Sequence, residues 1–333
     1  MTSTTSEVVL RAEGLNKTFK AQQSFISKSS DPVHAVKDVS LSIKRGETLA
    51  LVGESGSGKS TVARLLCRLE KADSGDVEVL GIDWAGQTES RLRTHRHDLQ
   101  MVFQDPYSSL DPMKMVVHLI GEPLKARRQM NRGEVDRIVS NLMMQVGLSP
   151  SHIHRYPHEF SGGQRQRIAI ARALAAEPAV IIADEAVSAL DVSVQAQVLN
   201  LLRKLQADRG VAILFITHDL GVVRQVADRV AVMYLGQIVE TGSANSVLDD
   251  PQHPYTRNLL AAVPEIDPDL RQKRHVLAGE PLSTADREHG CLFRNRCPLA
   301  IERCETENPE LHSAGQIEVA CHVVAHSHRN VEV

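Results

Sequence analysis

The residues Gly53-Glu54-Ser55-Gly56-Ser57-Gly58-Lys59-Ser60 carry the clearest chemistry in this sequence of 333 residues. Their spacing is that of the G-x-x-x-x-G-K-[ST] loop, whose glycines let the backbone wrap around phosphate oxygens with its N–H groups turned inward. At this spacing Lys59 would reach the β- and γ-phosphates of a nucleotide, and the Ser60 hydroxyl would bind Mg²⁺. A glycine-rich turn with a solvated lysine is the alternative interpretation.

The segments that flank this loop favour the nucleotide site. The apolar run Thr48–Val52 precedes the loop and has the length of a buried strand. From Thr61 onward the apolar residues follow helical spacing, and a helix that begins there would add its positive N-terminal end. Strand, glycine-rich loop and helix together are the context that a phosphate-binding loop needs.

Three further apolar runs end in polar residues that could serve the same nucleotide. These are 99–103 followed by Gln104, 179–183 followed by Asp184 and Glu185, and 211–216 followed by His218 after one threonine. Polar groups at the ends of parallel strands are well placed to meet a ligand. Asp184 fits the acidic partner of Mg²⁺, and Glu185 lies one step nearer an attacking water. A lone histidine is usually structural, but His218 lies where a third strand would meet the phosphates.

Ser161, Gly162, Gly163 and Gln164 open a helix expected over 165–176. Ser161 is a good N-cap, and the two glycines allow close approach of the backbone, so this helix N-terminus could also meet an anion. A plain helix cap is the alternative. Phe19, at the end of a first strand, could stack on adenine or could belong to a satellite core, and the pattern alone does not choose.

Composition indicates a globular protein with ample material for a core. Hydrophobic residues make up 42% and charged residues 24% of the chain, and the net charge of −3 gives no electrostatic case for nucleic-acid binding. No apolar run approaches 18 residues, and the first residues lack the features of a signal peptide. We therefore expect a cytosolic protein.

The length suits one large domain and a smaller one. Helical periodicity over about 105–175 predicts a helical subdomain inserted between strands. We expect a nucleotide-binding domain over 1–250 and a C-terminal accessory domain over 251–333.

Four of the five cysteines, Cys291, Cys297, Cys304 and Cys321, lie in the last 43 residues. A reducing compartment disfavours disulfides, and four thiolates on one metal centre would stabilise a small polar segment that has little core of its own. Zinc and an iron–sulfur cluster both accept four cysteines. Structural zinc usually brings a tight C-x₂₋₄-C pair, which this spacing lacks, whereas a cluster tolerates wide spacing.

Over about residues 8–330 the sequence resembles the ATP-binding cassette (ABC) ATPases. The matching strings are Gly53–Ser60 with the Walker A loop, which Thr61 follows, Gln104 with the Q-loop, Ser161–Gln164 with the signature sequence (Phe160 standing where Leu is usual), Val180–Glu185 with Walker B and its catalytic glutamate, Ser188–Asp191 with the D-loop, and His218 with the H-loop. Phe19 stands where that family places its adenine-stacking aromatic residue.

The resemblance implies an α/β P-loop fold with an antiparallel β subdomain and an inserted helical subdomain, followed by a small Cys-rich domain. It implies that ATP is hydrolysed by a water held by Glu185 and His218, with Mg²⁺ on Ser60, Gln104 and, directly or through water, Asp184. In this family the signature residues and Asp191 of one cassette complete the ATP site of a second cassette.

Three strings, 103–112, 253–264 and 291–298, look like one branch, the ATPase subunits of dipeptide/oligopeptide importers. That branch implies two membrane permease subunits, a second identical or homologous cassette, an extracytoplasmic solute-binding protein reached indirectly, and a place at the cytoplasmic face of the inner membrane. It also favours a 4Fe–4S cluster over zinc at the cysteines. The alternative function is a soluble ABC ATPase acting on DNA or the translation machinery.

One departure from the resemblance stands beside Walker B. Where relatives usually read Asp-Glu-Pro-Thr-Ser, this chain reads Asp184-Glu185-Ala186-Val187-Ser188. Both carboxylates are kept, but the restraint that Pro would place on the backbone is missing.

Overall fold

The computed structural model describes residues 7–20, 32–105, 109–127, 130–188, 190–262, 282 and 289–329. The sequence over 21–31 is polar and favours an exposed loop, and that over 265–287 is polar and linker-like; residues 21–31 and most of 265–287 lie outside this part of the chain. The chain divides into two compact units, the first made of Met1–Arg11, Ser42–Thr48 and Val77–Ile216 and the second of Ala12–Leu41, Leu49–Asp76 and Thr217–Val333.

A parallel sheet in the first unit has the order β8-β7-β6. Its strands are β6 (Leu99–Val102), β7 (Val180–Asp184) and β8 (Ala212–Thr217). Every residue of β7 and β8 is buried, as the continuous apolar runs predict for parallel strands covered on both faces.

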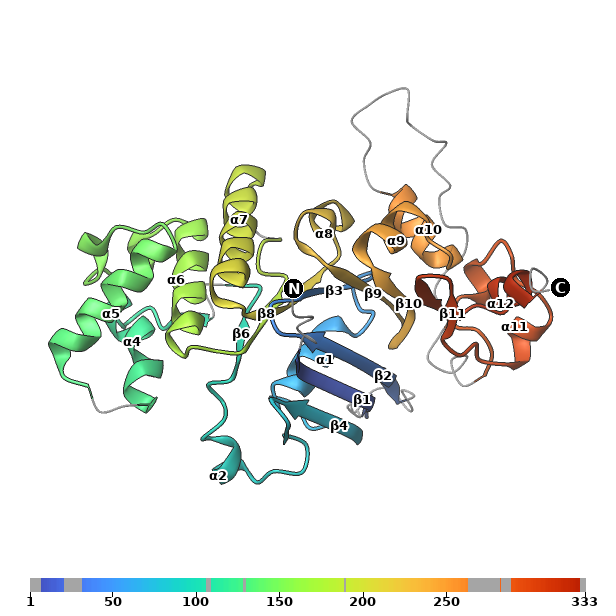
Figure 1. The fold of residues 1–333 in the computed structure, drawn as a ribbon, viewed down its shortest axis with the longest axis horizontal. Coiled ribbons are helices and arrows are strands. Elements are labelled where there is room, and N and C mark those ends of the chain that lie inside the picture. Colours follow the sequence, from blue (N-terminus) through green and yellow to red (C-terminus); the bar gives the residue numbers. More distant parts are fainter. Residues whose placement is uncertain are drawn as a thin grey trace, which may run out of the picture. The chain divides into compact units, whose positions relative to one another are not determined.

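The first unit contains the helices α2 (Glu89–Leu92), α4 (Val116–Arg127), α5 (Arg132–Gln145), α6 (Gly162–Ala175) and α7 (Val192–Arg209), with single 3₁₀ turns at Pro150–His152 and Pro157–Glu159. Of these helices, α4, α5 and α6 fall within 105–175, where the sequence predicts an inserted helical subdomain. Helices α4, α5 and α6 pack against one another (Figure 1). Local chemistry sets their ends: Asn131 and Glu134 form a capping box at α5, and α7 stops at Gly210, whose φ of 63° favours glycine.

The second unit contains a sheet with the order β11-β12-β10-β9-β3. Its strands are β3 (Thr48–Val52), β9 (Arg229–Tyr234), β10 (Gln237–Ser243), β11 (His312–Ala314) and β12 (Ile317–Val319). Strand β3 runs parallel to β9, and the others pair antiparallel. The runs 230–234 and 237–240 on either side of Gly236 predict a hairpin, and β9 and β10 form it. The pairing of β12 with β10 was not expected, and it ties the C-terminal residues to the sheet.

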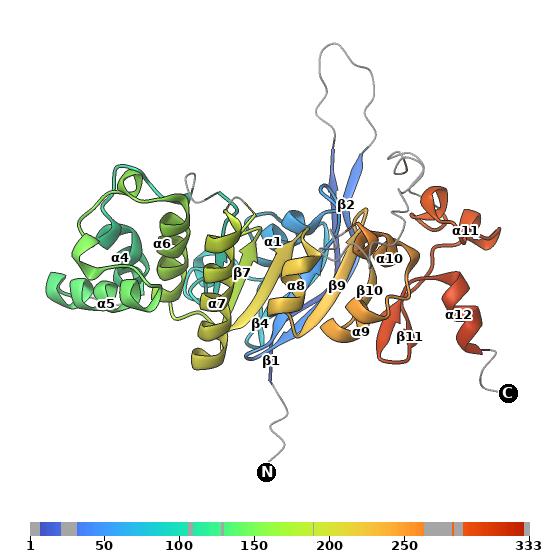
Figure 2. The same cartoon turned by 90° about the horizontal axis from the view of Figure 1, so that it is seen from above.

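Short helices complete the second unit. They are α1 (Lys59–Leu66), α8 (Leu220–Val226), α9 (Ala244–Asp249), α10 (Pro254–Ala261), α11 (Arg303–Thr306) and α12 (His322–Arg329), with a 3₁₀ turn at Arg294–Arg296. Helix α9 contacts β9 and β10, and Figure 2 shows it beside these strands. None of the helices in the described ranges is long and apolar enough to cross a membrane.

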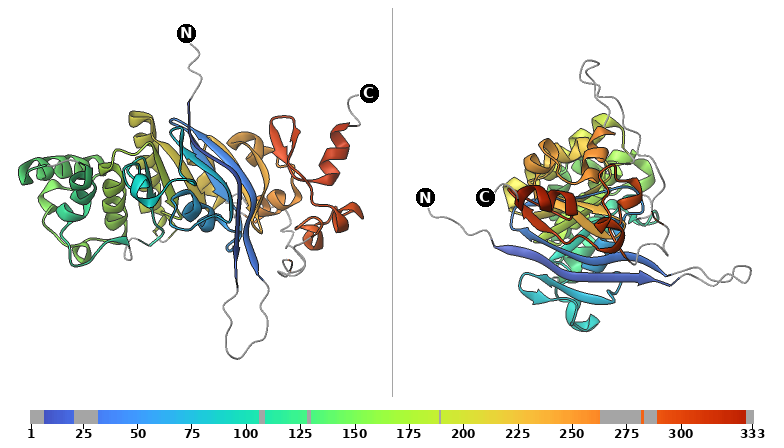
Figure 3. Two further views of the ribbon diagram at one scale, coloured as in Figure 1. Left: turned by 90° about the horizontal axis from the view of Figure 1, so that it is seen from below. Right: turned by 90° about the vertical axis from the view of Figure 1, so that its right-hand side faces the viewer.

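A separate four-stranded sheet has the order β2-β1-β4-β5. It consists of β1 (Val8–Phe19), β2 (Val33–Lys44), β4 (Ser74–Val79) and β5 (Ile82–Asp83), and its two long strands run side by side in both views of Figure 3.

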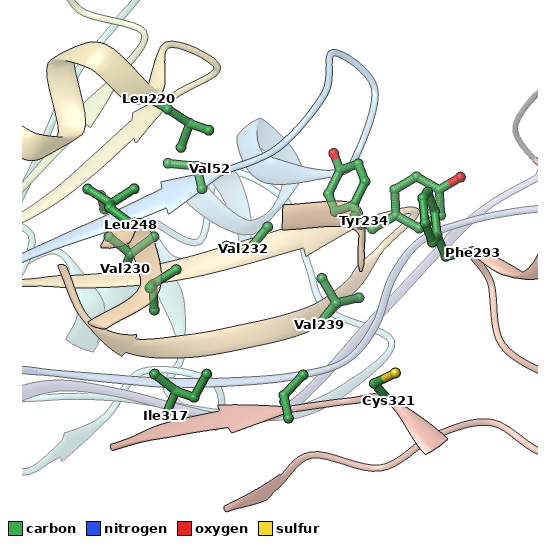
Figure 4. Close-up of a cluster of buried hydrophobic side chains, with 14 of the residues drawn as sticks. Val52, Leu220, Val230, Val232, Tyr234, Val239, Leu248, Phe293, Ile317 and Cys321 are labelled. Atoms are coloured by element: carbon green, nitrogen blue, oxygen red, sulfur yellow. The ribbon is translucent and has the colours of Figure 1, made fainter. Parts of the chain in front are cut away.

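A hydrophobic cluster in the second unit contains residues of the C-terminal segment. Leu292, Phe293, Ile317, Val319 and Cys321 pack with apolar residues of β3, β9 and β10 (Figure 4). The expectation that this segment has little core of its own to fold on, and therefore forms a separate Cys-rich domain, is not supported by this packing. Burial of these side chains stabilises the segment through the hydrophobic effect.

Candidate functional site

The phosphate loop lies between β3 and α1, as its sequence context predicts. The loop can take its path only because glycines stand at its tight points. A Cβ at Gly53 would lie 2.1 Å from the Met233 carbonyl oxygen, and one at Gly58, whose φ is 105°, would lie 2.2 Å from the Ala35 carbonyl oxygen. Both approaches are far inside van der Waals contact, so a side chain would displace the loop.

The amine of Lys59 is turned into this loop. Its Nζ donates to the carbonyl oxygens of Gly53 and Glu54, each at 2.8 Å, and the residue is only 4% exposed. A buried ammonium that donates only to neutral carbonyls is stabilised further when an anion binds, because an ion pair is stronger than a hydrogen bond to a carbonyl. The geometry is therefore that of an anion-binding loop.

Two other predicted site residues belong to the same unit. His218 follows β8 and is exposed, and the next residue, Asp219, caps α8 by accepting from the Gly221 N–H at 2.8 Å. Phe19 ends β1 with 40% of its surface exposed, and the Lys17 ammonium lies 5.3 Å from its ring centroid. The ring of Phe19 is thus not a core side chain and can offer a face to a planar ligand.

In the first unit the structure brings Gln104 and Glu185 together. The Gln104 amide Nε2 donates to Glu185 Oε2 at 2.8 Å. Glu185 has a φ of 46°, which a non-glycine residue rarely adopts, and its N–H is held by the Ile216 carbonyl at 2.9 Å. Strained backbone of this kind clusters at functional sites, where the surrounding structure holds a side chain in place.

The Ala186-Val187 departure leaves an ordered turn after Glu185. Both side chains are buried, and Ser188 closes the turn by donating from its N–H and its hydroxyl to the Glu185 carbonyl, at 3.2 and 3.0 Å. Burial and these two bonds hold the backbone where relatives use Pro.

The expected N-cap at Ser161 is confirmed. Its hydroxyl accepts from the Gln164 N–H at 3.4 Å, and the Gln164 side chain accepts from the Ser161 N–H at 3.0 Å. A Cβ on Gly163 would lie 2.1 Å from Val194 of α7, so only glycine permits this approach of the two helices. Asp191 caps α7, because its carboxylate accepts a hydrogen bond from the Val194 N–H. This hydrogen bond is the main reason why the pKa of the Asp191 carboxyl is lowered.

The four late cysteines lie together, but not in the geometry of a metal centre. Burial, and to a smaller extent the neighbouring thiols of Cys304, Cys297 and Cys321, raises the pKa of the Cys291 thiol to about 12. The Cys291 N–H also donates to the Cys304 carbonyl at 2.8 Å. Within the described ranges no group of three or more His, Cys, Asp or Glu is placed to hold a metal ion, so the expected iron–sulfur or zinc site is not supported.

Sequence reasoning missed Tyr255 and Arg296 as neighbours of the phosphate loop. The Tyr255 hydroxyl accepts from the Glu54 N–H at 2.9 Å, and the Arg296 guanidinium pairs with the Glu54 carboxylate at 3.0 Å. Both residues stand in strings that carry the branch resemblance, but no spacing pattern links positions this far apart.

A glycine-built phosphate loop with a buried lysine, between a buried strand and a helix, defines a P-loop nucleotide-binding protein. Residues 36–188 match the family described as ABC transporter, and residues 239–304 match the family described as oligopeptide/dipeptide transporter, C-terminal region. The chain belongs to the ABC transporter family, in the branch that carries this C-terminal region, and it is an ATP-binding and ATP-hydrolysing subunit.

Two curated peptide-transport relatives match along most of their length. The probable peptide ABC transporter ATP-binding protein y4tS of Sinorhizobium fredii is 49% identical over 96% of this chain and 91% of the relative. The oligopeptide transport ATP-binding protein OppF of Escherichia coli is 50% identical over 86% of this chain and 87% of the relative.

Solved structures confirm the P-loop fold. The ATP-binding cassette MJ0796, solved as a dimer in a post-hydrolysis state with ADP and Pi, superposes with a TM-score of 0.63 at 29% identity, covering 71% of this chain and 98% of that one. The CbiO1 subunit from Clostridium perfringens, part of the transporter complex CbiONQ, gives the same TM-score at 28% identity, covering 73% of this chain and 92% of that one.

Proposed function

We propose that the chain powers uptake of dipeptides, oligopeptides or similar small solutes through separate membrane subunits. The observation that carries this proposal is the match of residues 239–304 to the C-terminal region of oligopeptide/dipeptide transporters. Relatives named as peptide transport ATP-binding proteins support it. The partners would be two permease subunits and, indirectly, an extracytoplasmic binding protein, with the chain peripheral at the cytoplasmic face of the inner membrane.

A soluble ABC ATPase that acts on DNA or the translation machinery is the rival function. The net charge of −3 provides no basic surface excess for nucleic acid, and the curated relatives are named for transport. The comparison therefore favours transport.

In the proposed mechanism the phosphate loop binds ATP and Lys59 moves from the loop carbonyls to the β- and γ-phosphates. The donor set of Ser60, Gln104 and Asp184 consists of oxygens, which suits Mg²⁺, and this ion would neutralise charge on the phosphates. Glu185 and His218 orient the attacking water. Gln104 already holds the Glu185 carboxylate, so these two residues act as a pair that the bound nucleotide rearranges.

We further propose that two cassettes form the active unit. Ser161–Gln164 and Asp191 of one cassette would then contact nucleotide bound to the other, and Phe19 would stack on its adenine. The dimeric, ADP- and Pi-containing relative supports this arrangement. Residues 1–250 would be the nucleotide-binding domain, and 251–333 an accessory region. A 4Fe–4S cluster or zinc on Cys291, Cys297, Cys304 and Cys321 would require another arrangement of these thiols than the one described above.

The catalytic assignment is tested with Glu185→Gln. The amide keeps the size of the side chain but cannot accept a proton, and general-base groups typically contribute about 10²- to 10⁴-fold. We expect ATP hydrolysis, measured as phosphate release, to fall at least about 100-fold, while the dissociation constant for ATP changes little. Turnover close to the wild-type rate would remove Glu185 from this role.

A further inference from the structure

Glu54 stands at the centre of a set of contacts that joins the phosphate loop to the C-terminal region. Its N–H donates to the Tyr255 hydroxyl at 2.9 Å, and its carbonyl accepts from Lys59 Nζ at 2.8 Å. Its carboxylate accepts from both terminal nitrogens of Arg296, at 3.1 and 3.0 Å. All three polar groups of one loop residue are therefore held.

Arg296 is more buried than the Glu54 carboxylate that it binds, and it makes further contacts of its own. Its side chain is 9% exposed against 34% for Glu54, and it also donates to the Tyr234 hydroxyl at 3.3 Å. The guanidinium carbon lies 5.9 Å from the ring centroids of Tyr234 and Phe293. Burial opposes the charged form, but the bonds to Glu54 and Tyr234 outweigh burial, so the pKa of Arg296 is raised. A bidentate Arg–carboxylate ion pair at a partly buried site has a fixed geometry, unlike an ion pair that is exposed to solvent.

Tyr255 is fixed by aromatic packing. Its ring centroid lies 4.5 Å from that of Tyr234 and 5.6 Å from that of Phe293, and Figure 4 shows the Tyr234 and Phe293 rings side by side. Burial raises the pKa of Tyr255, so the phenol stays neutral and its oxygen accepts the Glu54 N–H. Helix α10 and the turn at Arg294–Arg296 thus meet at one loop residue, and Tyr234 at the end of β9 contacts both Tyr255 and Arg296.

A carboxylate in a loop that binds a polyanion raises an electrostatic problem. Unpaired, the Glu54 charge would repel the phosphates, whereas paired with Arg296 it is neutralised and its backbone is kept in place. We propose that Arg296 and Tyr255 are positioning residues for the phosphate loop, so that the C-terminal region sets the affinity of the loop for ATP through Glu54. This inference deepens the proposed function and rests on ATP binding at the loop.

The test is a double-mutant cycle on the full chain with MgATP. Arg296→Gln should weaken ATP binding and raise KM by about tenfold, in the usual range for coupled charged neighbours. The kcat at saturating ATP should stay within about twofold, because the water-activating groups are unchanged. Adding Glu54→Gln to Arg296→Gln should restore most of the affinity, since the uncompensated carboxylate is then gone. Tyr255→Phe, which keeps the ring, should weaken binding about threefold by the loss of one hydrogen bond.

Arg303→Gln is the matched control, because Arg303 lies in the same segment but pairs with the exposed Glu307. It should bind ATP as the wild type does. Wild-type affinity in both Arg296→Gln and Tyr255→Phe, or no recovery in the double variant, would overturn the inference. If the wild-type chain itself fails to bind ATP, the proposed function fails instead, and the two failures are thereby distinguished.

Discussion

Cys304 and Cys321 are buried and Cys291 and Cys297 are half-buried, so their thiolates would need a cation nearby if they formed. Without a cation, burial and mutual repulsion keep Cys291 and Cys297 protonated, with pKa values raised above the ordinary value. A bound metal reverses this preference by stabilising the thiolates. Metal binding by these four cysteines would therefore change both the charge of their thiols and the stability of the C-terminal segment.

At the scale of these residues we expect protein purified without oxygen to be brown and to absorb broadly near ~400 nm, as cysteine-ligated clusters do. Cys297→Ser should lose the bound iron and make the C-terminal segment more sensitive to protease. Cys67→Ser, which changes the cysteine outside the group, should retain both properties. Colourless protein with one zinc per chain would replace the cluster but keep the site, and metal-free protein would dismiss the site.

Individual site residues were predictable where a local pattern decides their place. Gln104, Asp184 and Glu185 were found because apolar runs of strand length end at them, and the structure places all three at or after strand ends. The contact of Gln104 with Glu185 and the left-handed backbone of Glu185 were not predictable, because both depend on how neighbouring strands pair.

Among the elements, α10 begins at a histidine that must stay neutral. The His253 ring accepts from the Tyr255 N–H at 3.0 Å, and burial lowers the pKa of His253 to about 3. In the unfolded chain the His253 imidazole binds a proton as the pH falls through 6.5, whereas in the folded chain it stays neutral down to about pH 3. His253 therefore lowers the free energy of unfolding as the pH falls from 6.5 toward 3 and has no such effect above that range. Buried Glu240 accepts from the His253 N–H at 3.2 Å, and burial raises the pKa of its carboxyl. Above about pH 4.5 this group therefore has the opposite effect, because it lowers the free energy of unfolding as the pH rises.

We therefore expect His253→Asn to remove part of the acid sensitivity. Asparagine can still cap α10 but does not titrate, and Glu240 is common to both proteins. Between about pH 6 and pH 4 the free energy of unfolding should depend less on pH in the variant than in the wild type. The two slopes should differ by roughly 1 kcal/mol per pH unit. Urea unfolding at several pH values measures this difference. The exposed His154→Asn is the control, and equal slopes for wild type and His253→Asn would contradict the assignment.

Elements with their own periodicity or caps were predictable, and elements that depend on distant pairing were not. The hairpin of β9 and β10 follows from alternation around Gly236, and α6 follows from Ser161. Strands β11 and β12 have only three residues each, too few for a pattern, and exist through the pairing of β12 with β10.

At the scale of the whole molecule, the proposed pair of cassettes depends on the start of α6. Ser161→Arg removes the cap and adds a cation to the positive end of the helix, so it should abolish ATP-dependent association while each chain still binds one nucleotide. Light scattering with and without ATP, in the Glu185→Gln background that slows hydrolysis, measures this. Ser161→Thr, which keeps a capping hydroxyl, should still associate. Association of the arginine variant would refute the shared site.

The bond between Glu54 and Arg296 spans 242 positions of the chain. A ribosome that adds about 5–20 residues per second needs roughly 10 to 50 s to travel between them. During that interval the nascent phosphate loop carries an uncompensated carboxylate and lacks the support of Tyr255 for most of the time. The growing chain would therefore hold nucleotide weakly until its last segment is made, and a prematurely terminated product would compete poorly for ATP.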